Sequence, residues 1–183
     1  GGCRIPVIPD WEGADTFPGE IIHSSKFKNG QAFTGKQVLV IGSGNSAAEI
    51  ASKLTGHARS VTVSVRTAPH ILPKSIYGIP LIGIGVWTRY WPTAWVDGIL
   101  RFLQRSLIGD LSAYGLPYPQ LPLSKQYAIN NVVPILYRPF VDDVRAGRIT
   151  IVGPVQKISG KTVHMLQRIQ TTHNHETDMV TAE

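Results

Sequence analysis

A glycine-rich turn directly after a short apolar run is the sequence feature that most constrains the fold. Residues 38–41 read VLVI, whose length and β-branched composition favour a strand buried on both faces of a parallel sheet. The turn Gly42-Ser43-Gly44-Asn45-Ser46-Ala47 follows and fits the pattern G-x-G-x-x-A. A helical segment over residues 47–54 ends at Gly56, and residues 61–65 give a second strand. This order predicts an α/β domain of the Rossmann type, with a parallel sheet in a three-layer arrangement.

Each small residue of this turn has a mechanical reason to be there. Gly42 allows a tight turn, Gly44 lets the backbone approach a pyrophosphate, and Ala47 lets the helix pack closely against the strand. We expect Asn45 or Ser46 to cap the helix. The first amides of the helix would face the turn, where the positive end of the helix dipole favours a phosphate. The segment therefore predicts a site for a dinucleotide.

The residue at the end of the second strand indicates which dinucleotide. An acidic residue about 20 positions after the glycines would bind the ribose hydroxyls of NAD. No Asp or Glu occurs between Glu49 and Asp97, and Arg66 followed by Thr67 stands at this point instead. A guanidinium and a hydroxyl suit the extra phosphate of NADP(H).

Two other interpretations of the turn stay open. Because glycine and alanine are common, a single G-x-G-x-x-A pattern can be a turn without a ligand. Residues 44–48 also form a degenerate nucleophile elbow, in which Ser46 would be the nucleophile of an α/β-hydrolase. Ala48 stands where that motif has its last glycine, and neither Gly42 nor Arg66 would then have a purpose. We therefore favour nucleotide binding.

Composition excludes several classes of protein. With 183 residues, 43% of them hydrophobic and 16% charged, the chain is long enough for one globular domain. Its single cysteine, Cys3, excludes an internal disulfide framework and is compatible with a reducing compartment; we expect a cytoplasmic protein. The net charge of +6 comes from scattered Lys and Arg residues, which argues against nucleic-acid binding.

A second motif lies before the glycine turn. Phe17, Gly19, His23 and Phe27 occupy the four fixed positions of F-x-G-x-x-x-H-x-x-x-[YF]. This is the signature of the flavin-containing monooxygenases, in which it lies shortly before a glycine fingerprint, as it lies here before Gly42. The chain resembles this family from about residue 6 to about residue 160, and within it the group that includes the plant indole-3-pyruvate monooxygenases.

The resemblance implies an activity and its cofactors. Members bind FAD and NADPH on two domains, and insert one atom of O2 into a small organic substrate by N-, S- or carbonyl oxygenation. His23 of the signature would couple the linker to the nucleotide domain. No residue of this chain would be catalytic, because oxygenation belongs to the flavin. The NADPH pyrophosphate would be held by Gly42, Ser43, Gly44, Asn45 and Ser46, and the adenosine phosphate by Arg66 and Thr67.

The resemblance also has gaps. The FAD fingerprint of the family is absent, so the FAD site would lie mostly outside this chain. The chain starts Gly1-Gly2 without an initiator methionine, so we expect a fragment that is inactive alone. A truncated module that only binds NADPH is the alternative.

The pattern divides the chain into three parts. We expect an inter-domain linker over residues 1–35, the NADPH-binding domain over 36–160, and the end of a small β-hairpin with a polar tail over 161–183. Within the domain we expect an amphipathic helix over residues 95–108, with Gln104 turned outward, and a long irregular loop over 110–138.

Two further segments bear on membrane contact and on metal binding. Residues 79–91 are strongly apolar but broken by Pro80 and two glycines, so we expect no transmembrane segment. They would form a hydrophobic flap or a peripheral contact with a membrane such as the endoplasmic-reticulum surface. His173-Asn174-His175 lacks a third ligand, so we expect no metal site.

Overall fold

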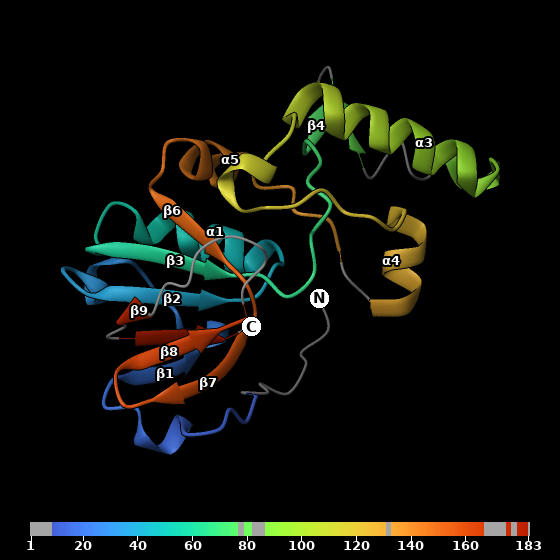
Figure 1. The fold of residues 1–183 in the computed structure, drawn as a ribbon. Coiled ribbons are helices and arrows are strands. Elements are labelled where there is room, and N and C mark those ends of the chain that lie inside the picture. The colour runs from blue at the N-terminus through green and yellow to red at the C-terminus, as the bar shows by residue number, and fades with distance from the viewer. Residues whose placement is uncertain are drawn as a thin grey trace.

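A parallel β-sheet forms the middle layer of the α/β part of the molecule, at the left in Figure 1. The computed structural model describes residues 9–76, 79–81, 87–130, 133–166, 175–176 and 179–182. Within them the sheet has five strands in the order β1-β10-β2-β3-β6, and every neighbouring pair is parallel. The strands are β1 (Glu20–His23), β2 (Gln37–Ile41), β3 (Ser60–Ser64), β6 (Ile149–Val152) and β10 (Met179–Ala182). This architecture confirms the predicted α/β fold.

Strand β2 packs into two cores at once, because successive side chains of a strand point to opposite faces. Val38 and Val40 are 2% and 1% exposed and belong to the larger core, on the helical face of the sheet. Leu39 is 1% exposed and belongs to the smaller core on the other face. Burial on both faces explains why this strand is an unbroken apolar run in the sequence.

Helices α1 (Asn45–Leu54) and α5 (Arg138–Arg145) cover one face of the sheet and pack against each other (Figure 1). Helix α1 starts shortly after the end of β2. The residues that it buries recur with the spacing of one helical face: Ala47, Ala48, Ile50, Ala51 and Leu54. The buried alanines leave room for the helix to lie close to the sheet.

A second, antiparallel sheet covers the opposite face. Its strands are β7 (Val155–Ser159), β8 (Thr162–Met165) and β9 (His175–Glu176). Ile158 and Val163 pack there with Leu39 of β2. The segment before β1 closes this side: Gly13 has a φ of 79°, and a Cβ there would lie 2.0 Å from the carbonyl oxygen of Ile158. The three layers are thus helices, parallel sheet and antiparallel sheet.

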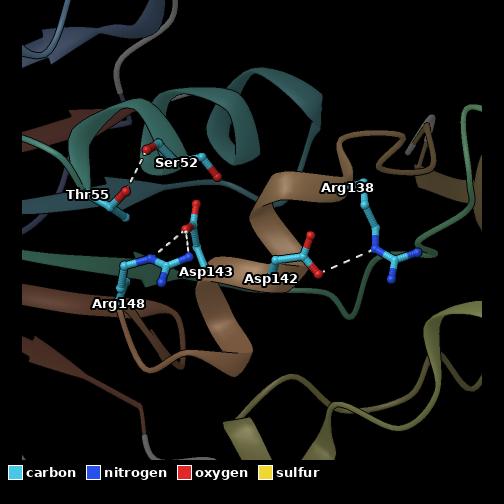
Figure 2. A network of polar contacts seen from close by, with 6 residues as sticks. All are labelled: Ser52, Thr55, Arg138, Asp142, Asp143 and Arg148. Carbon is cyan, nitrogen blue, oxygen red and sulfur yellow. Dashed lines mark hydrogen bonds and ion pairs between the residues drawn. The ribbon is translucent and has the colours of Figure 1, made fainter.

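A buried carboxylate holds the turn between α5 and β6 (Figure 2). Asp143 is 6% exposed, and its Oδ1 accepts hydrogen bonds from Nε and Nη2 of Arg148 at 2.8 and 2.7 Å. The exposed pair of Arg138 and Asp142 on the same helix is longer, at 3.5 Å. Exposed pairs of this kind stabilise little, whereas loss of Arg148 would leave a buried charge unpaired.

Between β3 and α5 the chain forms helices that stand away from the sheet (Figure 1). We call residues 87–130 the helical insertion. Helix α3 and the turn after it correspond to the helix predicted over residues 95–108, whereas α4 lies in the expected loop. No helix in the described ranges is long and apolar enough to cross a membrane. The elements are η4 (Thr88–Tyr90), α3 (Thr93–Leu103), a π-helical turn (Gln104–Ile108), η6 (Ser112–Tyr114) and α4 (Leu123–Asn130), preceded by the strand pair β4 (Ser75–Ile76) and β5 (Ile79–Pro80).

The end of the chain differs from the expected polar tail, because β9 and β10 lie in it. Strand β10 is inserted between β1 and β2 and pairs with both. The facing edges of β1 and β2 carry backbone N–H and C=O groups that a strand between them can satisfy. Strand β1 comes from residues 1–35, which were expected to be a linker, and β10 comes from residues 161–183, so the sheet contains strands from both of these segments.

Candidate nucleotide-binding site

The carboxyl ends of the parallel strands meet at one edge of the sheet, where ligands bind in open α/β folds. The pairing register aligns His23 with Ala182, Ala182 with Ile41, and Ile41 with Ser64. These residues end β1, β10, β2 and β3. The glycine turn after Ile41 and the Arg66 segment after Ser64 therefore start from neighbouring positions on adjacent strands.

The glycine turn has the backbone that the motif requires. Gly42 has a φ of 137°, which side chains rarely allow, and its N–H donates to the carbonyl of Ser64 at 3.1 Å. Gly44 is the N-cap of α1, and no side chain caps this helix. The prediction that Asn45 or Ser46 is the cap is therefore wrong. The helix begins at Asn45 itself, because Gly44 is the cap: its backbone is extended, and its carbonyl accepts a hydrogen bond from Ala48 N–H at 3.1 Å.

The end of helix α1 at this edge suits an anion. No acidic side chain lies in its first turn, and no side chain competes as a cap for its first amides. The carboxylate farther along the helix, Glu49, pairs with Lys53 at 2.7 Å. That hydrogen bond to Glu49 raises the pKa of Lys53. The electrostatics of this helix end therefore favour a phosphate group.

The predicted binding residues are accessible at this edge. Residues 42–45 are half-buried, and Ser46 and Arg66 are exposed. Val65, between Arg66 and the end of β3, is 2% exposed and its N–H donates to the carbonyl of Val152 at 3.0 Å. This anchor fixes the backbone from which Arg66 and half-buried Thr67 extend.

The side chain of Asn45 forms hydrogen bonds with the backbone of a distant segment of the chain. Its Nδ2 donates to the carbonyl of Pro134 at 2.8 Å, and its Oδ1 accepts from the N–H of Leu136 at 2.7 Å. Ile135, between these two residues, pairs through its own backbone with His70 and Leu72 at 2.8 and 2.9 Å. Asn45 thus binds the chain that returns from the helical insertion.

A buried polar cluster lies behind the Arg66 segment, and sequence reasoning missed it. His70 is 4% exposed; its Nδ1 lies 3.0 Å from the side-chain oxygen of Gln104 and its Nε2 lies 2.9 Å from the carbonyl of Leu121. Gln126 is 2% exposed and donates to the carbonyl of Ala68 at 2.8 Å. The predicted outward position of Gln104 is wrong, because the side chain is 4% exposed and occupied with His70.

The four signature residues have mainly structural contacts. Phe17 is 8% exposed in the smaller core, and the ring of Phe27 lies 5.4 Å from that of Phe33. The Nδ1 of His23 accepts from Ser25 N–H at 3.1 Å and caps the short helix η2 (Ser24–Lys26). Gly19 is half-buried directly before β1. Because His23 is the last residue of β1, it lies at the same edge of the sheet as the glycine turn.

Three other features of the described residues concern a possible nucleophile, a surface hollow and metal ligands. Ser46 lies in the first turn of α1 rather than at the tip of a strained turn, which argues against a nucleophile elbow. A hollow of about 320 Å³ that includes Lys36 lies at the amino end of β2, far from the glycine turn along that strand. The described ranges hold no cluster of potential metal ligands, and His173 and Asn174 lie outside them.

The segment expected to touch a membrane is only partly described. Residues 82–86 lie outside the described ranges. Trp87 and Tyr90 are 85% and 83% exposed. Contact with a membrane stays a prediction.

The fold and this edge together define an α/β domain of the Rossmann type. Residues 3–90 match the family described as flavin-binding monooxygenase-like (FMO-like). The chain is therefore related to the flavin-binding monooxygenases, and this part of it carries the pattern of that family.

Curated relatives agree with this assignment. The probable indole-3-pyruvate monooxygenase YUCCA10 of Arabidopsis thaliana is 36% identical over 164 residues, which cover 89% of this chain and 41% of that protein. The indole-3-pyruvate monooxygenase YUCCA4 of Oryza sativa subsp. japonica is 32% identical over 152 residues, covering 82% of this chain and 35% of that protein. The chain thus spans well under half the length of these relatives.

Solved structures of monooxygenases share the fold. A flavin monooxygenase from Stenotrophomonas maltophilia has a TM-score of 0.57 at 17% identity, over 97% of this chain and 38% of its own. OTEMO in complex with FAD and NADP has a TM-score of 0.68 at 16% identity, over 100% of this chain and 46% of its own. At such identities the likeness concerns the fold.

Proposed function

We propose that this chain is the NADPH-binding part of an FAD-dependent monooxygenase that inserts one atom of O2 into a small organic substrate. One observation carries the proposal: the uncapped start of α1 and the Arg66 segment follow adjacent strands at the same edge of the sheet. Relationship to the flavin-binding monooxygenases supports it independently.

The residues present fit NADP. Backbone amides around the glycine turn bind the pyrophosphate, and Gly44, which lacks a side chain, allows close approach. The guanidinium of Arg66 and the hydroxyl of Thr67 bind the adenosine phosphate, which NADH lacks. These groups bind and orient the cofactor, and they leave the catalytic chemistry to the flavin.

FAD fits this chain only in part. The sequence contains no second G-x-G-x-x-[G/A] turn, so the phosphates of FAD are held by residues outside these 183. When bound, FAD supplies the oxygen chemistry of the intact protein. For the substrate we propose a carbonyl compound, an amine or a sulfide, with indole-3-pyruvate-like compounds first because of the relatives' names.

Cofactor discrimination by Arg66 tests the proposal. We expect Arg66→Ala to weaken NADPH binding by about 1.5–3 kcal/mol, the usual value of a hydrogen bond to a charged group, and to leave NADH binding nearly unchanged. Arg59→Ala is the matched control, because Arg59 is exposed and lies before the other end of β3. Titration calorimetry with both cofactors measures the effect. Equal losses for NADPH and NADH, or an equal loss in the control, would contradict the assignment.

The second candidate is a module that binds NADPH without catalysis, favoured because the sequence contains no second glycine turn that would bind FAD. Oxygen-dependent oxidation of NADPH, measured with added FAD on the protein as isolated from its source rather than on these 183 residues alone, separates the two candidates. Turnover supports a complete enzyme, whereas NADPH binding without turnover supports the module.

A further inference from the structure

We infer that Asn45 is a positioning residue, whose side-chain amide sets the place of the phosphate-binding turn by holding the extended segment 134–136. This inference rests on the proposed function. It changes the expected role of Asn45, which the motif presents as a direct ligand of the pyrophosphate.

The geometry of the amide carries the inference. Asn45 is the first residue of α1, so its side chain moves with the helix end that faces the phosphate. It donates to the carbonyl of Pro134 at 2.8 Å and accepts from the N–H of Leu136 at 2.7 Å. Two bonds with opposite directions to residues i and i+2 fix the plane of the amide as well as its position. An Asp could not replace it, because a carboxylate cannot donate to Pro134.

The segment held by Asn45 is itself pinned on its other side. Ile135 is 1% exposed, its N–H donates to the carbonyl of His70 at 2.8 Å, and its carbonyl accepts from Leu72 N–H at 2.9 Å. Segment 134–136 therefore lies between the Asn45 side chain and the backbone of residues 70–72.

The hydrogen bonds of segment 134–136 link the two halves of the proposed site, which are the glycine turn and the Arg66 segment. The glycine turn is connected through Asn45 to segment 134–136, and from there to residues 70–72, which follow Arg66 by a few positions. His70 continues the link to Gln104 of the helical insertion at 3.0 Å. Movement of the insertion would thus reach the start of α1 through hydrogen bonds.

The test compares Asn45→Ala with the unmodified chain in two measurements. Amide hydrogen exchange without cofactor should be faster at Leu136, which loses its acceptor, and at Ile135 and Leu72, which lose support, but unchanged at Val63 in the sheet. The dissociation constants of NADPH and NADH should rise by the same factor, about threefold to tenfold, because both share the pyrophosphate. Arg66→Ala should instead affect NADPH alone.

Controls keep the test decisive. Asn29→Ala removes an exposed asparagine from the loop before β2 and should change neither measurement. If Asn45→Ala does not fold, Asn45→Ser replaces it, since a serine suits the first turn of a helix but cannot reach both partners.

Three outcomes would overturn the inference. Weaker binding with unchanged exchange would make Asn45 a direct ligand. Faster amide exchange with unchanged affinity for NADPH and NADH would show that the Asn45 hydrogen bonds do not affect cofactor binding. Absence of NADPH binding in the unmodified chain would remove the proposed function first and this inference with it.

Discussion

Helices α1 and α3 have nearly the same length but opposite surroundings. Helix α1 has ten residues and buries five of them, whereas α3 has eleven residues and none is buried. Trp91, Trp95, Ile99 and Phe102, at spacings of four, four and three, lie along one face of α3 or just before it and are 50%, 69%, 44% and 69% exposed. The first helix is therefore held by its own domain, and the second presents an apolar face to the solvent.

The same difference separates the α/β domain from the helical insertion as a whole. Apart from Val133 and Leu166, the large exposed apolar side chains of the described ranges lie in the helical insertion. Clusters of this kind mark contact surfaces. The insertion is fixed to the domain partly by buried Ile108, Leu111 and Leu116, and partly by the polar cluster around His70. Among the described residues the apolar face of α1 is covered by its own domain, whereas that of α3 is exposed.

Matched isoleucines give the largest expected contrast. Ile50 of α1 is 6% exposed, and Ile50→Ala should lower the free energy of unfolding by about 2–5 kcal/mol through lost burial and the cavity left behind. Ile99→Ala in α3 should lower it by less than about 1 kcal/mol, because the side chain is already 44% exposed. Urea unfolding followed by circular dichroism measures both. Equal losses would mean that α3 is covered in solution.

A smaller effect is expected where the two regions join. Gln104→Leu removes the partner of His70 Nδ1 and leaves a buried polar atom unpaired, which should cost about 1–3 kcal/mol. Gln104→Glu keeps the shape and an acceptor, and serves as the control. Thermal unfolding measures stability, and limited proteolysis shows where the chain opens. We expect cleavage to increase in the insertion before it increases in the sheet; the reverse order would show that this contact supports the core.

The smallest effect concerns an exposed turn of the insertion. The backbone N–H of Ser112 donates to Asp110 at 2.8 Å and lowers the pKa of this carboxyl. A lowered pKa in the folded state means that the ionised form stabilises the fold above the unfolded pKa, and that this contribution disappears as the pH falls through the folded value. Asp110→Asn should therefore lower the Tm slightly near neutral pH, and this difference should shrink as the pH falls below the ordinary pKa of an aspartate. A difference that stays the same over this pH range would show that charge is not the cause.

The local part of the site could be predicted from the sequence, and its long-range part could not. The strand, glycine turn, helix and second strand are contiguous, so their order alone places Gly42 and Arg66 just after the ends of adjacent strands. The Asn45 bonds to Pro134 and Leu136 span about 90 residues, and the His70 contact with Gln104 spans 34. No local sequence pattern predicts hydrogen bonds between residues so far apart in the chain. Gln104 was misplaced because polarity suggested solvent exposure, whereas the buried imidazole needed a polar neighbour.

The position of β10 has a consequence for how the protein is made. Residues 179–182 lie between strands formed by residues 20–23 and 37–41, so the facing edges of β1 and β2 stay unpaired until residue 182 has been synthesised. Pairing across such sequence separations is slow, and the waiting strand edges can associate with other chains. Chaperone demand and expression yield should thus respond to changes in residues 179–182 that weaken their pairing with β1 and β2.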